Sequence, residues 1–484
     1  MTMDIPEPPL DKAKHVRYFQ RCFRSLLPHH YTSTDSARLM LGFFIIAGLD
    51  LLSSDSPEPP LLTSADRVRL REWILSHQHP SGGFCGSPHH VLPRRHQTNF
   101  AIEDEVDVAK DPANAHIYAT YFGLLGLGIL AEGDGFHAFE DIDRMRTLRW
   151  LKKLQRPDGS FGEVITEDGY IAGGRDMRYC YIAATIRWVL GGAEKGGSDD
   201  IDVDALVAHI RKGQTFDGGV AESSTHESHS GYAYCAVACL SMLDYANPDR
   251  TAAPDHYIRA GIPSVPSLIH FLVSRQFAYL DDSSSTTSDD DGDDDEREPP
   301  SLEPLCLDDP THTVGFNGRL NKVADTCYTW WVCGALALLA ERSLVDRVPA
   351  RRFILDKTQH LIGGFAKHPG GPPDIYHAYL GLAALGTMAG DEGEDGIGRF
   401  DARLCVSESA ARRIGKAREG FLAHEDASST HNDENEVEEA AGDKGQDSNL
   451  QKSLEEARKI SATLKTEGKR AVVEMDHWGP YGRG

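Results

Sequence analysis

The feature that most constrains the fold is a repeated two-part unit. A glycine-rich turn follows one helical stretch, and a second stretch rich in small and aromatic residues follows the turn. A unit of this kind cannot bury its own apolar face, so neighbouring repeats stack and share one core. The turns are expected at residues 82–84, 158–161, 216–219, 315–318 and 363–365.

Two kinds of helix alternate along the chain. Stretches that are apolar on nearly every face are typical of inner helices, and stretches with one charged face are typical of outer helices. This alternation predicts an all-α double layer, either closed into an α/α barrel or open as a solenoid. The inner helices are expected at 117–130, 179–190, 232–243, 327–340 and 376–388, and the outer ones at 67–77, 144–154, 203–211, 266–276 and 351–359.

The net charge of −24 is concentrated in two segments. Residues 281–298 carry −9 and residues 421–450 carry −8, which leaves the rest only mildly acidic and excludes a basic nucleic-acid footprint. The polar composition of 281–304 cannot bury enough apolar surface to fold. We therefore expect a body at 12–420, interrupted by a disordered insertion at 281–304 between two repeat helices, and a mostly disordered tail at 421–484 with one charged helix near 450–464.

The chain shows no sign of a secretory signal or a membrane span. Its start is polar and proline-rich. The apolar run at 39–49 has eleven residues, whereas a span needs about 20. Nine scattered cysteines without a CxxC pair favour a reducing compartment. We expect a soluble, cytoplasmic protein.

The densest group of reactive side chains lies at residues 318–331. Asp325 and Cys327 are plausible zinc ligands at a helix start, although Asp325 could instead be an N-cap and Cys327 a core residue. His377 occupies the comparable position in the next unit, so adjacent repeats would bring the three together. Three protein ligands with one open position indicate a catalytic zinc.

Cations at several helix starts indicate an anion site. Arg319 and Lys322 share a face and suit a diphosphate. Arg178 and His229 begin two other inner helices; each alone could be a surface cap, but in a ring they would converge on one rim. A positive rim above an aromatic well fits an isoprenoid diphosphate. The aromatic residues expected below the rim are Tyr181, Tyr232, Tyr328 and Trp331.

Four motifs carry a resemblance to a known family. They are DMRYCY at 176–181, HSGYAYC at 229–235, GRLNKVADTCYTWW at 318–331 and GGFAKHPGGPPDIYHAYLGLAALG at 363–386. Together they resemble the β subunits of the protein prenyltransferases, and are most similar to those of type I geranylgeranyltransferases, over about residues 14–390.

The resemblance implies an α/α toroid with a catalytic zinc on Asp325, Cys327 and His377. It also implies an obligate α subunit, geranylgeranyl diphosphate as one substrate, and CaaX proteins such as Rho-type small GTPases as the other. The diphosphate would be held by His229, Arg319, Lys322 and Tyr328, with Arg178 nearby.

Two positions bear on which prenyltransferase this is. In farnesyl and Rab-directed relatives an Asp associated with magnesium matches the segment 365–369; this chain has Lys367, so we expect no magnesium requirement. Met40 stands where farnesyl enzymes have Trp and animal type I enzymes have Thr. Met is smaller and more flexible than Trp, so a C20 chain should fit beside Met40 and Phe44, with looser selection of chain length.

The leading hypothesis is transfer of geranylgeranyl to a CaaX cysteine through a zinc-bound thiolate, with Lys367 stabilising the departing diphosphate. A farnesyltransferase β subunit is the nearest alternative. A terpene cyclase on the same toroid is disfavoured because no DxDD motif occupies a cavity-lining position. A non-catalytic binding module is disfavoured because it does not account for the joint occurrence of metal-ligand residues and cations at these positions.

Overall fold

A computed structural model describes residues 8–53, 60–87, 114–132, 137–166, 169–193, 199–247, 249, 251–279, 312–389 and 396–439, with side chains up to residue 424. It divides into two units, Met1–Ala423 and His424–Gly484. The disordered insertion predicted at 281–304 and the helix predicted near 450–464 lie outside the described residues. The boundary placed at residue 420 stays a prediction, since one helix, α14 (Glu408–Glu439), runs through it.

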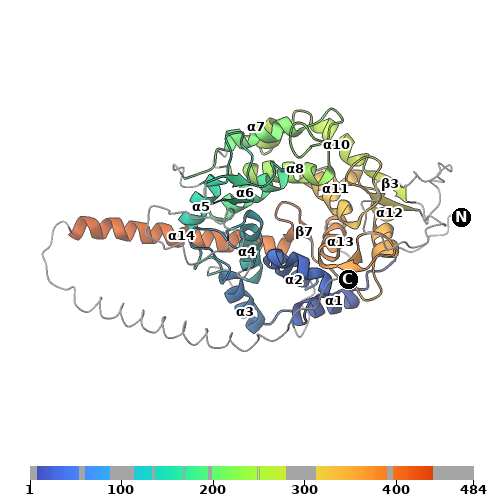
Figure 1. The fold of residues 1–484 in the computed structure, drawn as a ribbon, viewed down its shortest axis with the longest axis horizontal. Coiled ribbons are helices and arrows are strands. Elements are labelled where there is room, and N and C mark those ends of the chain that lie inside the picture. The colour runs from blue at the N-terminus through green and yellow to red at the C-terminus, as the bar shows by residue number, and fades with distance from the viewer. Residues whose placement is uncertain are drawn as a thin grey trace, which may run out of the picture. The chain divides into compact units, whose positions relative to one another are not determined.

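Six inner helices in the described part of the first unit form a closed ring (Figure 1). Each packs on the next, and the last packs on the first, so the choice left open between barrel and solenoid is settled as a toroid. The sixth helix is the apolar run at 39–49. The ring consists of α2 (Arg38–Leu51), α4 (Ile117–Leu130), α6 (Met177–Val189), α8 (Ser230–Tyr245), α11 (Thr326–Leu338) and α13 (Ile375–Met388).

The outer layer is amphipathic, as predicted. In α5, for example, Leu148 and Leu151 are buried while Lys152 and Lys153 are exposed. The helix predicted at 266–276 ends earlier, at Val273, because Gln276 begins a strand. The outer helices are α1 (Lys12–Arg24), α3 (Ser64–Leu75), α5 (Arg144–Lys153), α7 (Val203–Gly213), α10 (Val265–Val273) and α12 (Arg347–Arg352), which continues as a π-helix, η5 (Phe353–Thr358). Shorter elements are η1 (His29–Ala37), α9 (His256–Gly261) and η4 (Arg342–Leu344).

Glycine is required in the turns because each one touches the backbone of the next outer helix. Gly159 has φ +88°, and a Cβ there would lie 1.9 Å from the Ala205 carbonyl oxygen. Gly363, also at φ +88°, meets the Lys14 carbonyl in the same way and so packs the last turn on α1. The turn predicted at 315–318 is different, because Gly315 and Phe316 lie in a strand.

A glutamine side chain fastens successive outer helices, a feature that the sequence analysis did not find. Gln155 donates to the Asp202 carbonyl at 2.8 Å and accepts from the Asp202 N–H at 2.7 Å, just before α7 begins. Gln359 joins the last unit to the first, because its Oε1 accepts from Asp11 N and from His15 Nε2. Gln214 makes the same pair with Ser264, while Gln78 and Gln276 each donate to a carbonyl two residues before the N–H that they accept.

Within the described ranges the strands form four short antiparallel pairs. β3 (Gln276–Tyr279) pairs with β4 (Thr313–Phe316), with Tyr279 opposite Thr313. In the sequence, the predicted insertion therefore falls between two paired strands, which themselves lie between the repeat helices α10 and α11. The other pairs are β1 (Val164–Ile165) with β2 (Ile171–Ala172), β5 (Phe365–Ala366) with β6 (Pro373–Asp374), and β7 (Phe400–Asp401) with β8 (Val406–Ser407).

The β7–β8 hairpin is held inside the ring by tyrosines from different inner helices. Tyr181, Tyr234 and Tyr379 donate to the carbonyls of Arg403, Ala402 and Cys405 at 2.7–2.9 Å. The Arg403 side chain lies over Tyr245, the last residue of α8. The hairpin thus forms a floor near the C-terminal ends of the inner helices. No helix in the described part of the chain combines the length and apolar character needed to span a bilayer.

Candidate metal and diphosphate site

The candidate site lies at the N-terminal ends of the inner helices, opposite the hairpin floor. Five of these six ends carry a polar N-cap whose side chain accepts a backbone N–H, whereas α2 begins after Ala37, which offers no side-chain cap. The caps are His116 of α4, Asp176 of α6, His229 of α8, Asp325 of α11 and Asp374 of α13.

Asp325, Cys327 and His377 come together as predicted. One ligand atom from each lies within 4.8 Å of the other two, and all three residues are buried. His377 Nε2 is 3.3 Å from Asp325 Oδ1. Asp325 is also the N-cap of α11, since its Oδ1 accepts from Cys327 N at 2.8 Å. The cap and ligand interpretations are therefore compatible, because a carboxylate has lone pairs for both.

Asp374 orients His377, a role that the sequence analysis missed. Asp374 Oδ1 accepts from His377 N at 2.9 Å, and Oδ2 is 2.6 Å from His377 Nδ1. These bonds turn Nε2 toward Asp325 and Cys327, as a carboxylate behind a metal-binding histidine does. The three-residue spacing from Asp374 to His377 is the only sequence signal for this role.

The electrostatics of the cluster suit a cation. Burial lowers the pKa of His377, but the hydrogen bonds to Asp325 and Asp374 outweigh it and raise that pKa to about 9. Burial and the Asp325 carboxylate raise the pKa of the Cys327 thiol. A bound cation would stabilise the charged carboxylate and thiolate together. The oxygen, sulfur and nitrogen donors fit zinc.

Lys367 lies beside this cluster. Thr326, the first residue of α11, donates its N–H to the Lys367 carbonyl at 3.0 Å and its hydroxyl to Ala366. The Lys367 charge counteracts the burial that raises the pKa of Cys327. The backbone of Lys367 thus adjoins the start of α11, and its role at the diphosphate stays a prediction.

His229 and Tyr328 lie between the Asp325–Cys327–His377 cluster and the basic loop 318–322. His229 Nε2 is 3.0 Å from Tyr328 Oη, and Ser230 N donates to the Gly318 carbonyl at 2.9 Å. Arg319 lies close enough for its charge to act on His229: burial, followed by the charges of Arg319 and Arg178, lowers the pKa of His229 to about 4. Lys322 lies in the same loop, where its carbonyl accepts from Asn317 Nδ2 at 2.8 Å.

Two cations of the rim already have carboxylate partners that the sequence analysis did not identify. Arg178 donates from Nε to both oxygens of Asp176 and lies over the Tyr232 ring at 5.9 Å. Arg319 Nη1 is 3.3 Å from Glu227 Oε2. An anion at the rim must compete with these carboxylates.

Aromatic rings gather between rim and floor. The Phe44 ring lies 5.4–5.6 Å from those of Phe122, Tyr376 and Tyr379. Trp331 lies 5.1 Å from Tyr234, and Met40 is half-buried against the same core. The Tyr181 hydroxyl donates to the floor, and its side chain is buried to the same extent as Phe44, so its place beside the lipid stays a prediction.

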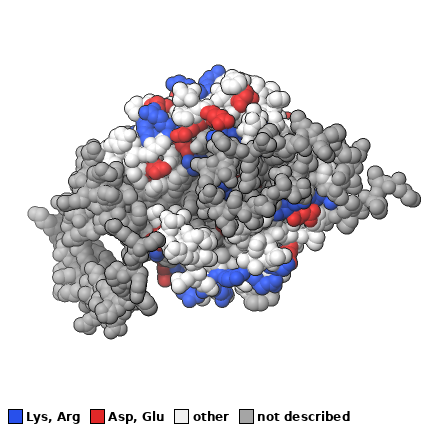
Figure 2. Space-filling view, turned by 45° about the vertical axis from the view of Figure 1, so that its right-hand side comes forward, with Lys and Arg blue, Asp and Glu red and all other residues white. Residues whose placement is uncertain are grey.

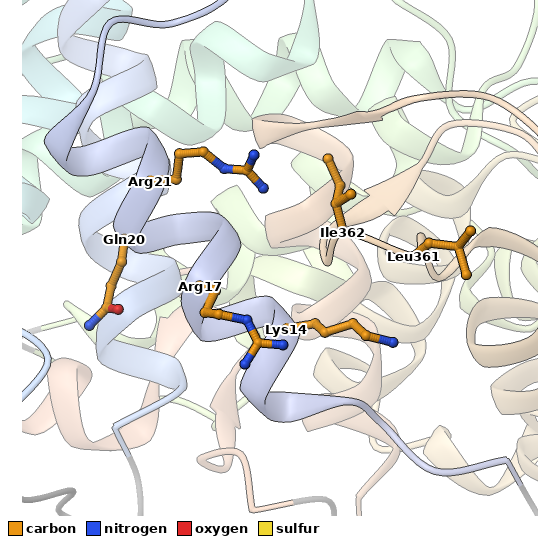
Figure 3. Close-up of a pocket in the computed structure, with 6 residues that line it drawn as sticks. All are labelled: Lys14, Arg17, Gln20, Arg21, Leu361 and Ile362. Atoms are coloured by element: carbon orange, nitrogen blue, oxygen red, sulfur yellow. The ribbon is translucent and has the colours of Figure 1, made fainter.

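A separate open pocket lies on the outer surface (Figure 3), between α1 and the turn at 360–364. Lys14, Arg17 and Arg21 of α1 face Leu361 and Ile362 of that turn. None of the predicted site residues lines it, so it is distinct from the candidate site. Figure 2 shows Lys and Arg along the lower edge of one face, at the level of α1 and α3 in Figure 1.

Comparison with known proteins identifies the family. The prenyltransferase α-α toroid domain model matches residues 10–406, and the chain belongs to that family. The chain is 29% identical to geranylgeranyl transferase type-1 subunit beta of Arabidopsis thaliana over 394 residues, 79% of this chain and 86% of the relative. It is 27% identical to a protein farnesyltransferase subunit beta of Pyricularia oryzae over 78% of this chain and 63% of the relative.

A solved structure agrees in fold. Candida albicans protein geranylgeranyltransferase-I complexed with GGPP superposes with a TM-score of 0.63 at 24% identity, and the match covers 84% of this chain and 99% of that one. The resemblance to prenyltransferase β subunits, and the toroid that it implies, are confirmed.

Proposed function

We propose that this chain is the catalytic β subunit of a type I protein geranylgeranyltransferase. It would transfer the C20 group of geranylgeranyl diphosphate to the cysteine of a C-terminal CaaX motif in which X is usually Leu. The observation that carries the proposal is the buried cluster of Asp325, Cys327 and His377, with Lys367 beside it and the basic loop 318–322 nearby. Type-1 beta subunits among the relatives support it.

Asp325, Cys327 and His377 would hold one zinc ion and leave one position open. Zinc lowers the pKa of a bound thiol, so it would supply the substrate cysteine as a thiolate at neutral pH. Asp374 holds His377 in the orientation that this binding needs.

The transfer joins the cysteine sulfur to C1 of the isoprenoid. The C1–O bond breaks with its electron pair on the diphosphate, and the thiol proton passes to water. The basic loop and the His229–Tyr328 pair would stabilise the negative charge that grows on the diphosphate. His229 Nδ1 accepts from Gly231 N, so Nε2 carries the proton and donates to Tyr328 Oη. The Tyr328 hydroxyl can then donate its own hydrogen to the anion.

Lys367 would supply positive charge where some relatives use magnesium, so the proposed enzyme needs no Mg²⁺. The lipid would lie between rim and floor against Met40, Phe44, Tyr181, Tyr232 and Trp331. Tyr181 would also hold the floor through its hydroxyl.

The proposal includes a separate α subunit, CaaX clients such as Rho-type small GTPases and a cytoplasmic location. A farnesyltransferase β subunit is the second candidate, since relatives of that name match over similar lengths of this chain.

The test is a matrix of substrates. The chain is co-expressed with a prenyltransferase α subunit, and turnover is measured for CaaX-Leu and CaaX-Ser peptides with C15 and C20 diphosphates. We expect the highest kcat/KM for C20 with CaaX-Leu. Preference for C15 with CaaX-Ser would support the farnesyl alternative, and absence of turnover with all four pairs would refute both.

A further inference from the structure

Arg275 is a buried cation with unused donors. It lies between α10 and β3 and is 5 % exposed. Its guanidinium lies over the Phe271 ring at 4.9 Å, and Nη2 donates to Ser274 Oγ at 3.3 Å. Nε and Nη1 donate to no acceptor among the described residues. Burying an unpaired charge costs free energy, so a carboxylate that paired with Arg275 would be stabilising.

Arg275 lies beneath the loop that carries Arg319 and Lys322. Its carbonyl accepts from Asn317 N at 3.3 Å, and the Asn317 side chain donates to the Lys322 carbonyl. The stretch that leads to His229 packs on Phe271, the ring beneath the Arg275 guanidinium. A Cβ on Gly219 would lie 2.8 Å from Phe271 and 2.6 Å from Ser228. Arg275 is therefore near Glu227, which precedes Ser228.

Two carboxylates act on Arg275 from this side, Asp217 and Glu227. Asp217 is committed elsewhere, since it accepts from Gly219 N, the Thr215 hydroxyl and the Ser228 hydroxyl. Glu227 is paired with Arg319, and its side chain is 57% exposed. Glu227 is thus the carboxylate that can change partner.

Binding of a diphosphate creates the need for such a change. Glu227 competes with the phosphate oxygens for Arg319, and a carboxylate left beside the bound diphosphate would repel it. A second cation on the other side of Glu227 removes that repulsion.

We propose that Arg275 takes the Glu227 carboxylate when Arg319 turns to the isoprenoid diphosphate. Glu227 and Arg275 are then positioning residues that set the affinity for the diphosphate without touching it. This inference rests on the proposed function, because it assumes that Arg319 binds the diphosphate.

The experiment is a double-mutant cycle in the assembled heterodimer. Glu227→Gln, Arg275→Met and the double variant are compared by calorimetric titration with geranylgeranyl diphosphate. Glu227→Gln should bind more tightly and Arg275→Met more weakly than the unaltered protein, each by up to about tenfold, which corresponds to ~1.4 kcal/mol. The double variant should match Glu227→Gln, because Arg275 acts only through Glu227.

Further variants separate positioning from folding. Arg275→Lys keeps the cation and should retain most of the affinity. Arg187→Met removes another mostly buried arginine, which is paired with Asp200 and not with Glu227. This variant should lower the stability of the fold without changing the affinity for the diphosphate. In turnover assays Arg275→Met should raise KM for the diphosphate and leave KM for the peptide unchanged.

The outcomes distinguish the two proposals. If Arg275→Met weakens binding equally with and without Glu227, the exchange is refuted while the proposed function stands. If neither the unaltered protein nor any variant binds the diphosphate, both the partner exchange and the proposed function are refuted.

Discussion

Gln359 closes the ring, and the cost of removing its side chain can be estimated from the hydrogen bonds that it makes. His15 is fully buried, and its Nδ1 accepts from Gly364 N, so its Nε2 carries the proton that Gln359 Oε1 accepts. Gln359→Ala leaves this N–H buried without a partner, at a cost of about 1–3 kcal/mol, and removes the bond to Asp11 N, worth about 1 kcal/mol. The expected loss in the free energy of unfolding is about 3 kcal/mol.

Gln155→Ala is the matched control, because it removes the same kind of link between neighbouring units within the ring. Its partner Asp202 is exposed, so water replaces the lost bonds and the expected cost is about 1 kcal/mol. Both variants are measured by urea denaturation followed by tryptophan fluorescence. A Gln359→Ala protein no less stable than Gln155→Ala would show that the junction between the last and first units does not limit stability.

Three further predictions follow from the site and the buried histidines. Cys327→Ala should lose stoichiometric zinc by elemental analysis and nearly all turnover; retention of both would remove Cys327 from the ligand set. Met40→Trp should raise KM for the C20 diphosphate at least about tenfold relative to C15, since the larger ring overfills the lipid space; equal effects on both would place Met40 outside it. Burial lowers the pKa of His15 to about 4, so below its usual value of 6.5 the unfolded chain takes up a proton that the folded protein does not. Stability should therefore fall by about 2 kcal/mol between pH 7 and pH 5 from this residue, and His15→Gln should remove that share of the pH dependence in urea titrations.

Periodicity was enough to predict the layers of the fold but not their closure. The apolar and amphipathic helices differ in which faces carry charge, and that difference is visible in the sequence. Closure depends on single contacts between distant residues, such as Gly363 against Lys14 and Gln359 against Asp11, which no local pattern reports. The strand at 313–316 was mistaken for a turn because Gly315 and Gly318 resemble the glycines of the true turns.

The approach of Asp325, Cys327 and His377 to one another was predictable because equivalent positions of adjacent repeats meet in space. The counterions were not. Glu227 and Asp176 approach Arg319 and Arg178 through side chains whose direction depends on loop geometry, and the hairpin that receives Tyr181 lies outside the repeats. If the rim binds an anion as proposed, these residues would set how strongly it does so.

The pairing of β3 with β4 has a consequence for how this chain can vary. Tyr279 and Thr313 are neighbours across a ladder, so the ends of the intervening chain are held within about 5.5 Å whatever lies between them. The entropy of closing a flexible connection grows only with the logarithm of its length, by about 0.6 kcal/mol for each doubling. A flexible connection between these two strand ends could therefore vary widely in length at little thermodynamic cost, without moving the strands that hold the ring.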